Sequence, residues 1–234
     1  MIDRIDDKLL LQCGDLQGHE LLSEMIKNIF HNCIALVSSF GAHSAILLDM
    51  VSRIDKRTHV VFLDTGKLFP ETLRYQQTLV RHLKLENIRI CEPAHADVES
   101  CDPSGDLWAS NPDQCCYIRK VRPLHEALKG FDCWITGRKR YQGGLRTRLE
   151  TIEFIDGVTK INPLALWSQE MVREYFIKHD LPYHPLYENG YLSLGCMPCT
   201  SRAGEKGNER DGRWPYSKKA ECGIHGRDLR NSDY

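Results

Sequence analysis

Short apolar runs that alternate with helical segments constrain most strongly how this chain of 234 residues can fold. Four of these runs, at residues 34–37, 59–63, 88–91 and 133–136, have the length and composition of buried strands. The segments between the first three carry apolar residues at helical spacing. Strands joined through helices pair in parallel by right-handed crossovers, and helices then cover both faces of the sheet. The sequence therefore predicts an α/β fold with a mostly parallel sheet and helices on both of its faces.

The end of the first run is a candidate anion site. Ser38 and Ser39 lead, through Phe40 and Gly41, from a strand into the start of a helix. Unpaired backbone N–H groups at a helix start attract anions, and small residues let a phosphate approach. Because ligands of such sheets bind beyond the carboxyl ends of the strands, we expect this segment to share one rim with residues 64–66. The segment has neither the lysine of a Walker loop nor the Rossmann glycine pattern, so an ordinary strand-to-helix turn is the alternative.

The second half of the chain has three further features. Residues 151–161 are predicted to form a hairpin, because Asp156-Gly157 favours a tight turn. Residues 167–179 are predicted to be a helix with Ser168 as its N-cap. From residue 200 the chain is rich in Gly, Arg, Lys and Glu and has few apolar residues to bury. We therefore expect an α/β domain over residues 1–199 and a flexible C-terminal segment over residues 200–234.

The charge and the N-terminus narrow the classes of function and location. A net charge of −1 and a pI of about 6.8 predict neither a nucleic-acid nor a membrane partner. The first residues are polar and acidic and lack the apolar stretch of a signal peptide. No run in the sequence approaches the roughly 18 apolar residues that suggest a membrane span. These features predict a cytoplasmic protein.

Two pairs of cysteines form a candidate metal centre. Cys115-Cys116 and Cys196-Met197-Pro198-Cys199 supply four thiolates, the number that a cubane iron–sulfur cluster or a structural zinc requires. Adjacent cysteines point their side chains apart in regular structure, so they chelate a single zinc poorly. We therefore predict a cluster, with zinc and unligated thiols as alternatives. Most of the other cysteines before residue 200 are interpreted as small core or surface residues: Cys13, Cys33, Cys91, Cys101 and Cys133.

Basic residues occur where an anionic ligand could bind. Residues 138–140, Arg-Lys-Arg, leave a predicted strand at the ligand rim, with Arg146 and Arg148 beyond. Charged runs are usually solvated surface, but this position makes a phosphate or sulfate clamp the alternative. Arg119 and Lys120 directly follow the first cysteine pair, so they are either a solvated helix end or cations between a cluster and an anionic substrate. Arg210 and Arg213 are weaker candidates of the same kind.

A last cysteine, Cys222, is a candidate nucleophile. It lies in a polar segment with Lys219 and His225 nearby, and cations lower the pKa of a thiol and so increase its thiolate fraction. Glu221 acts in the opposite direction. A lone cysteine in a tail is commonly inert, so composition alone leaves both readings open.

Taken together, these motifs resemble the assimilatory sulfonucleotide reductases, which reduce adenylyl sulfate or its 3′-phospho form to sulfite. The resemblance covers nearly the whole chain. Its most specific parts are Gly195-Cys196-Met197-Pro198-Cys199-Thr200 and Glu221-Cys222-Gly223-Ile224-His225. Further matching segments are Ser38-Ser39-Phe40-Gly41, Leu63-Asp64-Thr65-Gly66, Phe69-Pro70-Glu71-Thr72, Asp113-Gln114-Cys115-Cys116, Arg119-Lys120, Thr136-Gly137 and Pro182-Tyr183-His184-Pro185-Leu186-Tyr187.

The resemblance implies an adenine-nucleotide α-hydrolase-like sheet and a role for each matching residue. It implies Cys115, Cys116, Cys196 and Cys199 as ligands of one 4Fe–4S cluster, and Cys222 as the nucleophile on a mobile segment. Lys120 would lie between cluster and substrate. The phosphosulfate would be held by Lys139, Arg140, Arg210, Arg213 and His225, and the nucleotide by Ser38, Ser39 and Leu63.

The resemblance also implies a reaction. Cys222 would form an S-sulfocysteine and release AMP, and thioredoxin or a similar dithiol protein would then release sulfite, in sulfate assimilation and cysteine biosynthesis. Members with the double-cysteine pattern generally prefer adenylyl sulfate, and a homo-oligomer is compatible with the resemblance. The alternatives are a reductase of the 3′-phosphorylated nucleotide or of both, and a non-catalytic iron–sulfur or zinc nucleotide sensor.

Two departures from the family pattern affect individual assignments. The common Arg-Arg-Asp-Gln-Ser is here Lys139-Arg140-Tyr141-Gln142-Gly143, which weakens the detailed assignment of the basic loop. An acidic residue often found in the first turn is replaced by His43 or Ser44, so recognition of the ribose is open.

Overall fold

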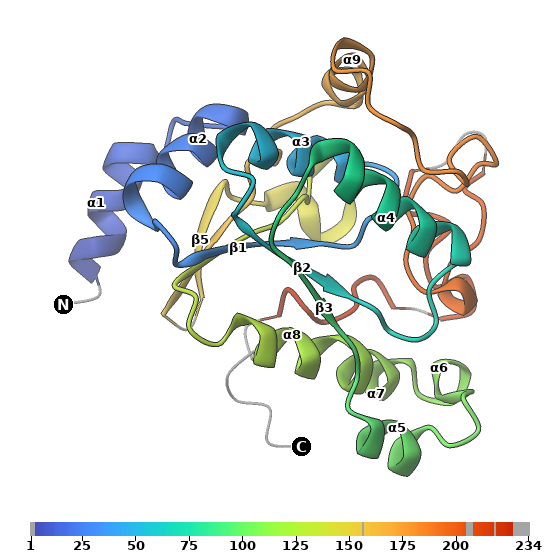
Figure 1. Cartoon of the computed structure of the whole chain (residues 1–234). Helices are drawn as coiled ribbons and strands as arrows, with labels where there is room; N and C mark the ends of the chain where they lie inside the picture. The colour runs from blue at the N-terminus through green and yellow to red at the C-terminus, as the bar shows by residue number, and fades with distance from the viewer. Residues whose placement is uncertain (1–2, 156, 205–207, 218, 227–234) are drawn as a thin grey trace.

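A central sheet organises the computed structural model, which describes residues 3–155, 157–204, 208–217 and 219–226. The described residues form a six-stranded sheet in the order β3-β2-β1-β4-β6-β5 (Figure 1). The strands are β1 (Ile34–Ser38), β2 (His59–Leu63), β3 (Ile88–Cys91), β4 (Cys133–Ile135), β5 (Ile152–Ile155) and β6 (Val158–Ile161). The predicted α/β class is confirmed.

The order of the strands creates a crevice at the centre of the sheet. All neighbouring pairs are parallel except β5 and β6, which form the predicted antiparallel hairpin. The chain moves outward from β1 through β2 to β3 and then returns to β4, on the other side of β1. Ligands of such sheets bind where the direction of winding reverses, outside the carboxyl ends of the strands. Here that position is the end of β1 and β4.

Helices and short helical turns connect these strands. They are α1 (Asp3–Cys13), α2 (Gly18–Glu24), η1 (Met25–Ile29), α3 (Ser44–Ile54), α4 (Pro70–Leu83), α5 (His95–Cys101), α6 (Leu107–Ser110), α7 (Pro112–Cys116), η2 (Tyr117–Val121), α8 (Arg122–Leu128), η3 (Arg140–Gln142), η4 (Gly144–Arg148), α9 (Gln169–Lys178) and η5 (Met197–Cys199).

The larger core lies on one face of the sheet, under α2, α3 and α4 (Figure 1). α3 is the central helix of this layer and contacts α2, α4 and α9. Its residues from Ala45 to Ser52 are all buried, which explains why this segment is apolar on every side rather than along one stripe. Phe62 of β2 packs edge-on against Phe40, and burial of a side chain of this size contributes about 1.5–3 kcal/mol.

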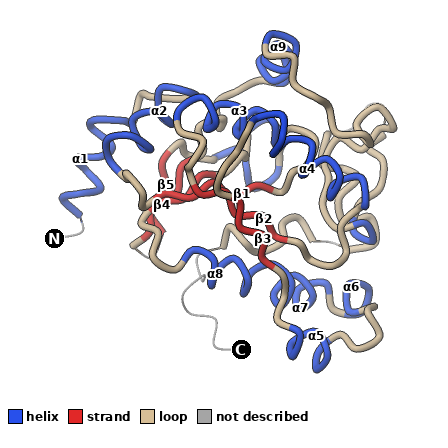
Figure 2. The backbone as a smooth tube through the Cα atoms, viewed as in Figure 1, coloured by secondary structure: helices blue, strands red, loops and turns tan. Residues whose placement is uncertain are grey.

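The opposite face has a smaller core that includes part of the C-terminal segment. Ala35, Val61 and Trp134 from the sheet pack with Leu124 of α8, and Ile224 packs against the same cluster. In Figure 2 this segment is a loop that crosses the face of the sheet next to α8. The described part of the C-terminal segment therefore contributes to the core beside α8.

The helix that carries Cys115 and Cys116 changes its winding just after them. α7, η2 and α8 follow one another without a break over residues 112–128, and η2 is a π-helical turn. Pro123 stands at the start of α8 and has no N–H to donate to the preceding turn. A wider turn accommodates this missing donor, and π turns of this kind often occur at functional sites.

The sequence missed two features at the N-terminal end. The apolar residues between 21 and 30 have the spacing of one helix, but this stretch divides into α2 and the π turn η1, and α1 precedes them. The predicted strands, the hairpin and the helix at residues 167–179 agree within a few residues, whereas α5 to α8 were not predicted. Ser168 caps α9 by accepting a hydrogen bond from the Met171 N–H at 3.2 Å. Of the predicted hairpin turn, Asp156 lies outside the described residues.

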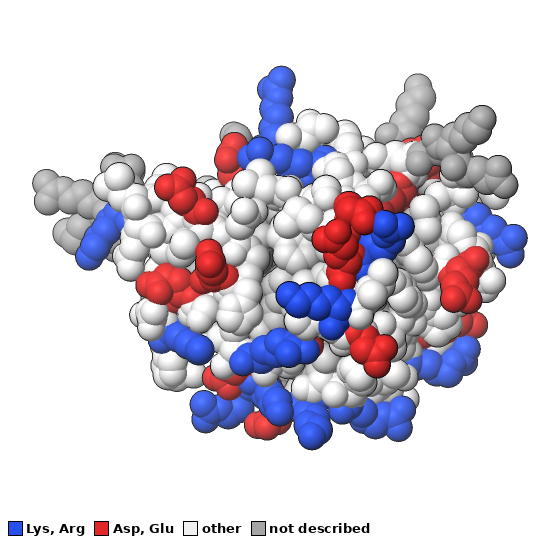
Figure 3. Space-filling view, turned by 90° about the horizontal axis from the view of Figure 1, so that it is seen from above, with Lys and Arg blue, Asp and Glu red and all other residues white. Residues whose placement is uncertain are grey.

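The surface mixes charges of both signs. Viewed from above the helices that cover the larger core, basic and acidic side chains are interspersed (Figure 3), as the net charge of −1 would suggest. Among the described residues, no helix combines the length and apolar character needed to cross a lipid bilayer.

Candidate active site

A cavity of about 220 Å³ lies at the carboxyl ends of the central strands. Its floor comes from the residues that follow β1, β2 and β4, and its other walls come from residues 192–195 and the C-terminal segment. Of the predicted site residues, the lining includes Ser38, Ser39, Leu63, Lys120, Lys139, Arg210, Arg213, Cys222 and His225. Residues from six separate parts of the chain thus meet at the position that the strand order indicates.

The turn after β1 presents backbone donors to this cavity. Ser38 Oγ accepts a hydrogen bond from the Phe40 N–H at 3.2 Å, and Phe40 has a φ of 47°. This left-handed residue turns the chain sharply, so that α3 begins directly after the cavity-lining residues Gly41 to His43. The N-terminus of α3 therefore faces the cavity, as a site for an anion requires.

His43 and Lys139 form a buried polar layer of the cavity wall with Glu209 from the C-terminal segment. His43 Nδ1 lies 3.7 Å from Glu209 Oε2. Burial, and secondly the charge of Lys139, lowers the pKa of His43 to about 3, so this ring is neutral. Burial lowers the pKa of Lys139 to about 8, and Glu209 partly opposes that shift. Glu209 is absent from the cavity lining and acts on it through these two side chains.

Of the two residues assigned to the phosphosulfate in the basic loop after β4, Lys139 lines the cavity and Arg140 does not. Arg140 is absent from the cavity lining, because its Nε donates to the Leu149 carbonyl at 2.7 Å and its side chain lies beside Glu150. Arg138 and Arg146 line the cavity instead. The sequence assigned Arg140 to the phosphosulfate, but the turn η3 points this side chain toward the loop itself.

Cys222 reaches the cavity on a segment that is held on both sides. Before it, Glu221 pairs with Arg146, whose Nε lies 2.6 Å from Glu221 Oε1. After it, the ring of His225 stacks on Trp134 with the ring centroids 5.6 Å apart and an interplanar angle of 7°. The thiol thus lines the same cavity as the Ser38–Ser39 turn, although the two are 183 residues apart.

Arg213 approaches the backbone of the cysteine loop closely. Its NH1 donates to Thr200 Oγ1 at 2.8 Å, and its guanidinium lies 4.5 Å from the ring centroid of Trp214. A Cβ atom at Gly195 would overlap this guanidinium. Residue 195 must therefore lack a side chain for Arg213 to occupy this position.

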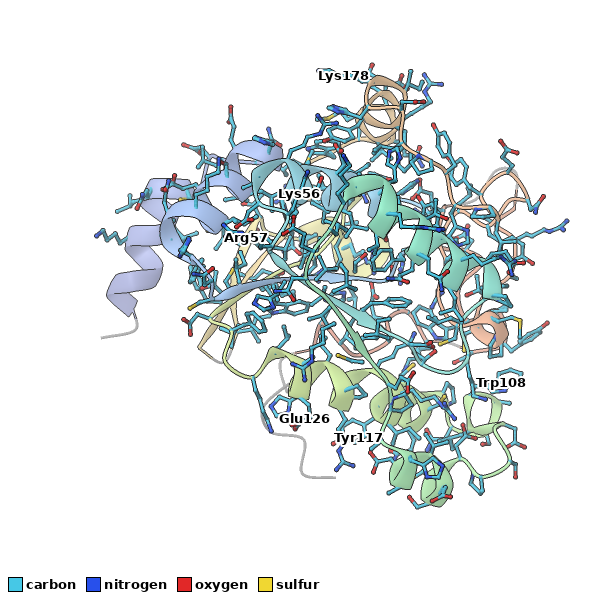
Figure 4. The ribbon with its side chains drawn as sticks, in the orientation of Figure 1. Lys56, Arg57, Trp108, Tyr117, Glu126 and Lys178 are labelled. Carbon is cyan, nitrogen blue, oxygen red and sulfur yellow. The ribbon has the colours of Figure 1, made fainter. Side chains whose placement is uncertain are left out.

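The two predicted cysteine pairs lie together in a second, smaller cavity. Cys115, Cys116, Cys196 and Cys199 all line it, along with Lys67, Arg119 and Lys120. Trp108 of α6 also contributes, and Figure 4 shows it among the helices on the side of the sheet that carries α7. Lys120 and Trp214 line both cavities. Their side chains therefore form a shared wall between the four thiols and the larger cavity.

The charges around the four thiols suit an anionic group. Burial raises the pKa of Cys116 to about 12. Burial acts on Cys196 in the same direction, but Lys120 and a hydrogen bond from Thr65 at 3.2 Å outweigh it, so the pKa of Cys196 is lowered. Burial also opposes the charged form of Lys120, yet the thiolates of Cys196 and Cys222 raise its pKa. Within the described residues, no group of three His, Cys, Asp or Glu side chains has the arrangement for a single metal ion.

Several residues that support the site had no sequence signal. Lys160 is fully buried, with Nζ 3.6 Å from Glu153 Oε2 and 5.2 Å from the Trp134 ring centroid. Arg119 lies beside the four cysteines and is held there by a buried ion pair with Asp102 at 2.6 Å. A lysine in the middle of an apolar strand is the one pattern that could have pointed to this network.

Known proteins resemble this chain in sequence and in fold. The family model for the phosphoadenosine phosphosulfate reductase domain matches residues 33–202, which is most of the chain. The chain belongs to this family. It is therefore a member of a family of oxidoreductases, as its resemblance to the sulfonucleotide reductases implied.

Individual members of the phosphoadenosine phosphosulfate reductase family match over most of their length. The adenosine 5′-phosphosulfate reductase of Mesorhizobium japonicum is 44% identical over 212 residues, which cover 91% of this chain and 84% of that protein. The phosphoadenosine 5′-phosphosulfate reductase of Gloeobacter violaceus is 36% identical over 224 residues, covering 94% and 92%. A crystal structure of phosphoadenylyl-sulfate reductase from Candida auris, in a phosphate complex, matches with a TM-score of 0.70 and 28% identity, covering 83% of this chain and 95% of that one.

Proposed function

We propose that this protein is a cytoplasmic enzyme that reduces adenosine 5′-phosphosulfate to sulfite and AMP, with Cys222 as its nucleophile. One observation supports this most directly: the Cys222 thiol lines the same cavity as the strand-end turn at Ser38 and Ser39. A nucleotide held by that turn would extend toward the basic wall of the cavity. A thiol, an anion-binding turn and a set of cations in one cavity suit attack on a sulfonucleotide.

The cations of the cavity would hold the phosphosulfate group. Lys139, Arg210 and Arg213 line the cavity from separate parts of the chain, and Lys120 lies on the side toward the four thiols. A thiolate that approaches a dianionic substrate is repelled, so these positive charges have to offset that repulsion as the transition state forms.

In the first step the Cys222 thiolate attacks the sulfur of the substrate. A bond forms between Cys222 Sγ and that sulfur, and the bond from the sulfur to the phosphate oxygen breaks. AMP leaves with the electron pair of that bond, and Cys222 becomes an S-sulfocysteine. No electron is supplied from elsewhere in this step.

In the second step a dithiol partner such as thioredoxin supplies two electrons. One of its thiolates attacks Cys222 Sγ, and sulfite leaves with the electron pair of the sulfur–sulfur bond. The second thiolate of the partner then attacks the mixed disulfide, so that Cys222 is released as a thiolate and the partner becomes a disulfide. The segment from residue 200 would have to close over the nucleotide for the first step and open to the partner for the second.

The four grouped cysteines fit a 4Fe–4S cluster better than they fit one zinc ion. Four thiols from two separate segments share one cavity, and Lys67 and Lys120 face that cavity with positive charge that a cluster of thiolates needs. Cys115 and Cys116 are successive residues of α7, a position that suits a group with several metal corners. When bound, the cluster would supply charge and rigidity, whereas the two electrons come from the dithiol.

The substrate assignment favours the nucleotide without a 3′-phosphate. The double-cysteine pattern is typical of members that prefer adenosine 5′-phosphosulfate, and the relatives from Mesorhizobium japonicum and Chelativorans sp. carry that name. The relative from Gloeobacter violaceus carries the name of the 3′-phosphorylated substrate, so reduction of that nucleotide or of both is the second candidate.

Thioredoxin-dependent release of sulfite from each of the two nucleotides tests the proposal. The protein would be purified without oxygen, and its iron would be counted. Strong preference for adenosine 5′-phosphosulfate, with about four irons per chain, is the expected result. Activity on both nucleotides would keep the mechanism and reject the preference. Nucleotide binding without sulfite release from either would favour a non-catalytic sensor and reject the proposal.

The affinity for AMP is expected to fall as the pH rises through about 8, because the buried Lys139, whose pKa burial lowers to about 8, then loses its charge. The charged and titratable groups that act on it are Glu209, Arg146 and His43. Bound phosphate stabilises the cationic form, so the decline should begin somewhat above this value. Calorimetric titration with AMP between pH 6.5 and 9.5, about three units around the pKa of Lys139, measures it. In the Lys139→Met variant the affinity for AMP should be lower than in the wild type and should not change with pH over this range. If the affinity of the variant declined as in the wild type, another group would be responsible for the decline.

A further inference from the structure

Among the described residues that line the larger cavity, Glu221 is the only acidic one. Its two carboxylate oxygens accept from Arg146, at 2.6 Å from Nε and 3.0 Å from NH2. Arg210 NH2 lies 3.1 Å from the same carboxylate. The side chains of Arg146, Arg210 and Glu221 are only 11%, 16% and 20% exposed. Two guanidinium groups thus hold one carboxylate directly beside the nucleophile, in a largely water-free environment where such contacts are strong.

Both arginines also have a fixed connection to the rest of the fold. Arg146 NH1 donates to Gln142 Oε1 at 2.5 Å, which ties it to the turn η3. Arg210 NH2 donates to the Ala220 carbonyl at 2.7 Å, one residue before Glu221. The contacts therefore join the loop after β4, the segment around residue 210 and the segment that carries Cys222.

We propose that Glu221 is the positioning residue that holds the Cys222 thiol over the cavity, through its paired contacts with Arg146 and Arg210. Opening of the C-terminal segment then requires the contact between Arg146 and Glu221 to break, because Arg210 belongs to the same segment as Glu221, and closing re-forms it. The proposal uses the proposed function only in taking Cys222 as the nucleophile. Glu221 touches neither the reacting sulfur nor the substrate in this role, so it is not a catalytic residue.

The same arrangement assigns the cations that remain available for the substrate. Arg138 is paired with Glu153, and Arg146 and Arg210 are paired with Glu221. Among the described residues of the lining, Lys120, Lys139 and Arg213 have no carboxylate at ion-pair distance. These three would hold the anionic group of the substrate together with Arg210, which also lines the cavity, while Arg146 is reserved for the position of the thiol.

The Glu221→Gln variant tests the proposal, because the amide keeps the size of the side chain and removes its charge. We expect the rate of iodoacetamide labelling of Cys222, followed by peptide mass spectrometry, to rise about tenfold or more, the change expected for loss of one charged hydrogen bond. The kcat should fall by a similar factor, while KM should not rise, because a negative charge leaves the cavity. A residue that held the substrate directly would raise KM.

Two further variants keep the test decisive. Arg146→Gln should increase the labelling of Cys222 as much as Glu221→Gln does. The double variant should add little to either, because both single variants remove the same contact between Arg146 and Glu221. The matched control is Glu170→Gln, which breaks the exposed pair between Arg173 and Glu170 at 2.5 Å and should leave labelling and turnover unchanged. Unchanged labelling of Cys222 in a folded Glu221→Gln protein would overturn the proposal. Labelling needs no turnover, so a wild-type protein without sulfite release would reject the function and leave this result intact.

Discussion

Replacing Cys222 with serine should lower sulfite release by more than about 10⁴-fold, a loss of the size seen when a covalent nucleophile is removed. A serine hydroxyl is not ionised at neutral pH, so it cannot form the covalent intermediate on which the second step depends. The exchange leaves the turn at Ser38 and Ser39 on the other wall of the cavity intact, and the four grouped cysteines line the second cavity. Binding of AMP and the iron content should therefore stay at the wild-type level.

The intermediate gives an independent measurement of the same prediction. Wild-type protein mixed with adenosine 5′-phosphosulfate, without a dithiol, should gain the mass of one SO₃ group on the peptide that contains Cys222. The Cys222→Ser protein should gain none. Cys101→Ser is the matched control, since Cys101 is exposed at the end of α5, outside both cavity linings, and it should behave as wild type. Sulfite release by the Cys222→Ser protein at a rate close to wild type would contradict the assignment of the nucleophile.

Replacing Cys196 with serine should reduce bound iron from about four atoms per chain to nearly none. Cys196 is buried and forms a hydrogen bond with Thr65. Of the four grouped cysteines it is the one whose pKa is lowered. Its thiolate is thus the one most favoured by the protein before any metal binds. Iron analysis and the visible absorbance of the anaerobic protein measure the loss, and the midpoint of thermal unfolding should fall with it.

A buried cysteine outside the group separates loss of iron from loss of fold. Cys133 is fully buried in β4, and a serine there should lower the free energy of unfolding by about 1–3 kcal/mol, because its hydroxyl is buried. Its iron content should nevertheless remain that of wild type. If Cys133→Ser and Cys196→Ser lost iron equally, the loss would reflect unfolding, and the assignment of Cys196 as a ligand would fail.

Much of the fold could be predicted from local patterns in the chain. β2 was predicted at residues 59–63, its observed bounds, because a short apolar run between polar residues has few other structures open to it. The cap at Ser168 and the hairpin at residues 151–161 followed in the same way from residues that act on their neighbours. The π turns η1 and η2 were missed, because they depend on how a helix packs and not on its apolar spacing.

For the candidate site, too, some features follow from local sequence and others depend on tertiary packing. Motifs in the sequence determined which residues carry reactive chemistry, because a thiol or a guanidinium keeps its chemistry wherever it lies. Only the tertiary structure decided which of them meet: it brought Cys222 to the turn after β1, turned Arg140 toward Leu149, and placed Glu209 beside His43, where no motif had marked it. The physical reason is that burial and charge pairing act between residues far apart in the chain, and they set the pKa of Lys139 and the partner of Glu221.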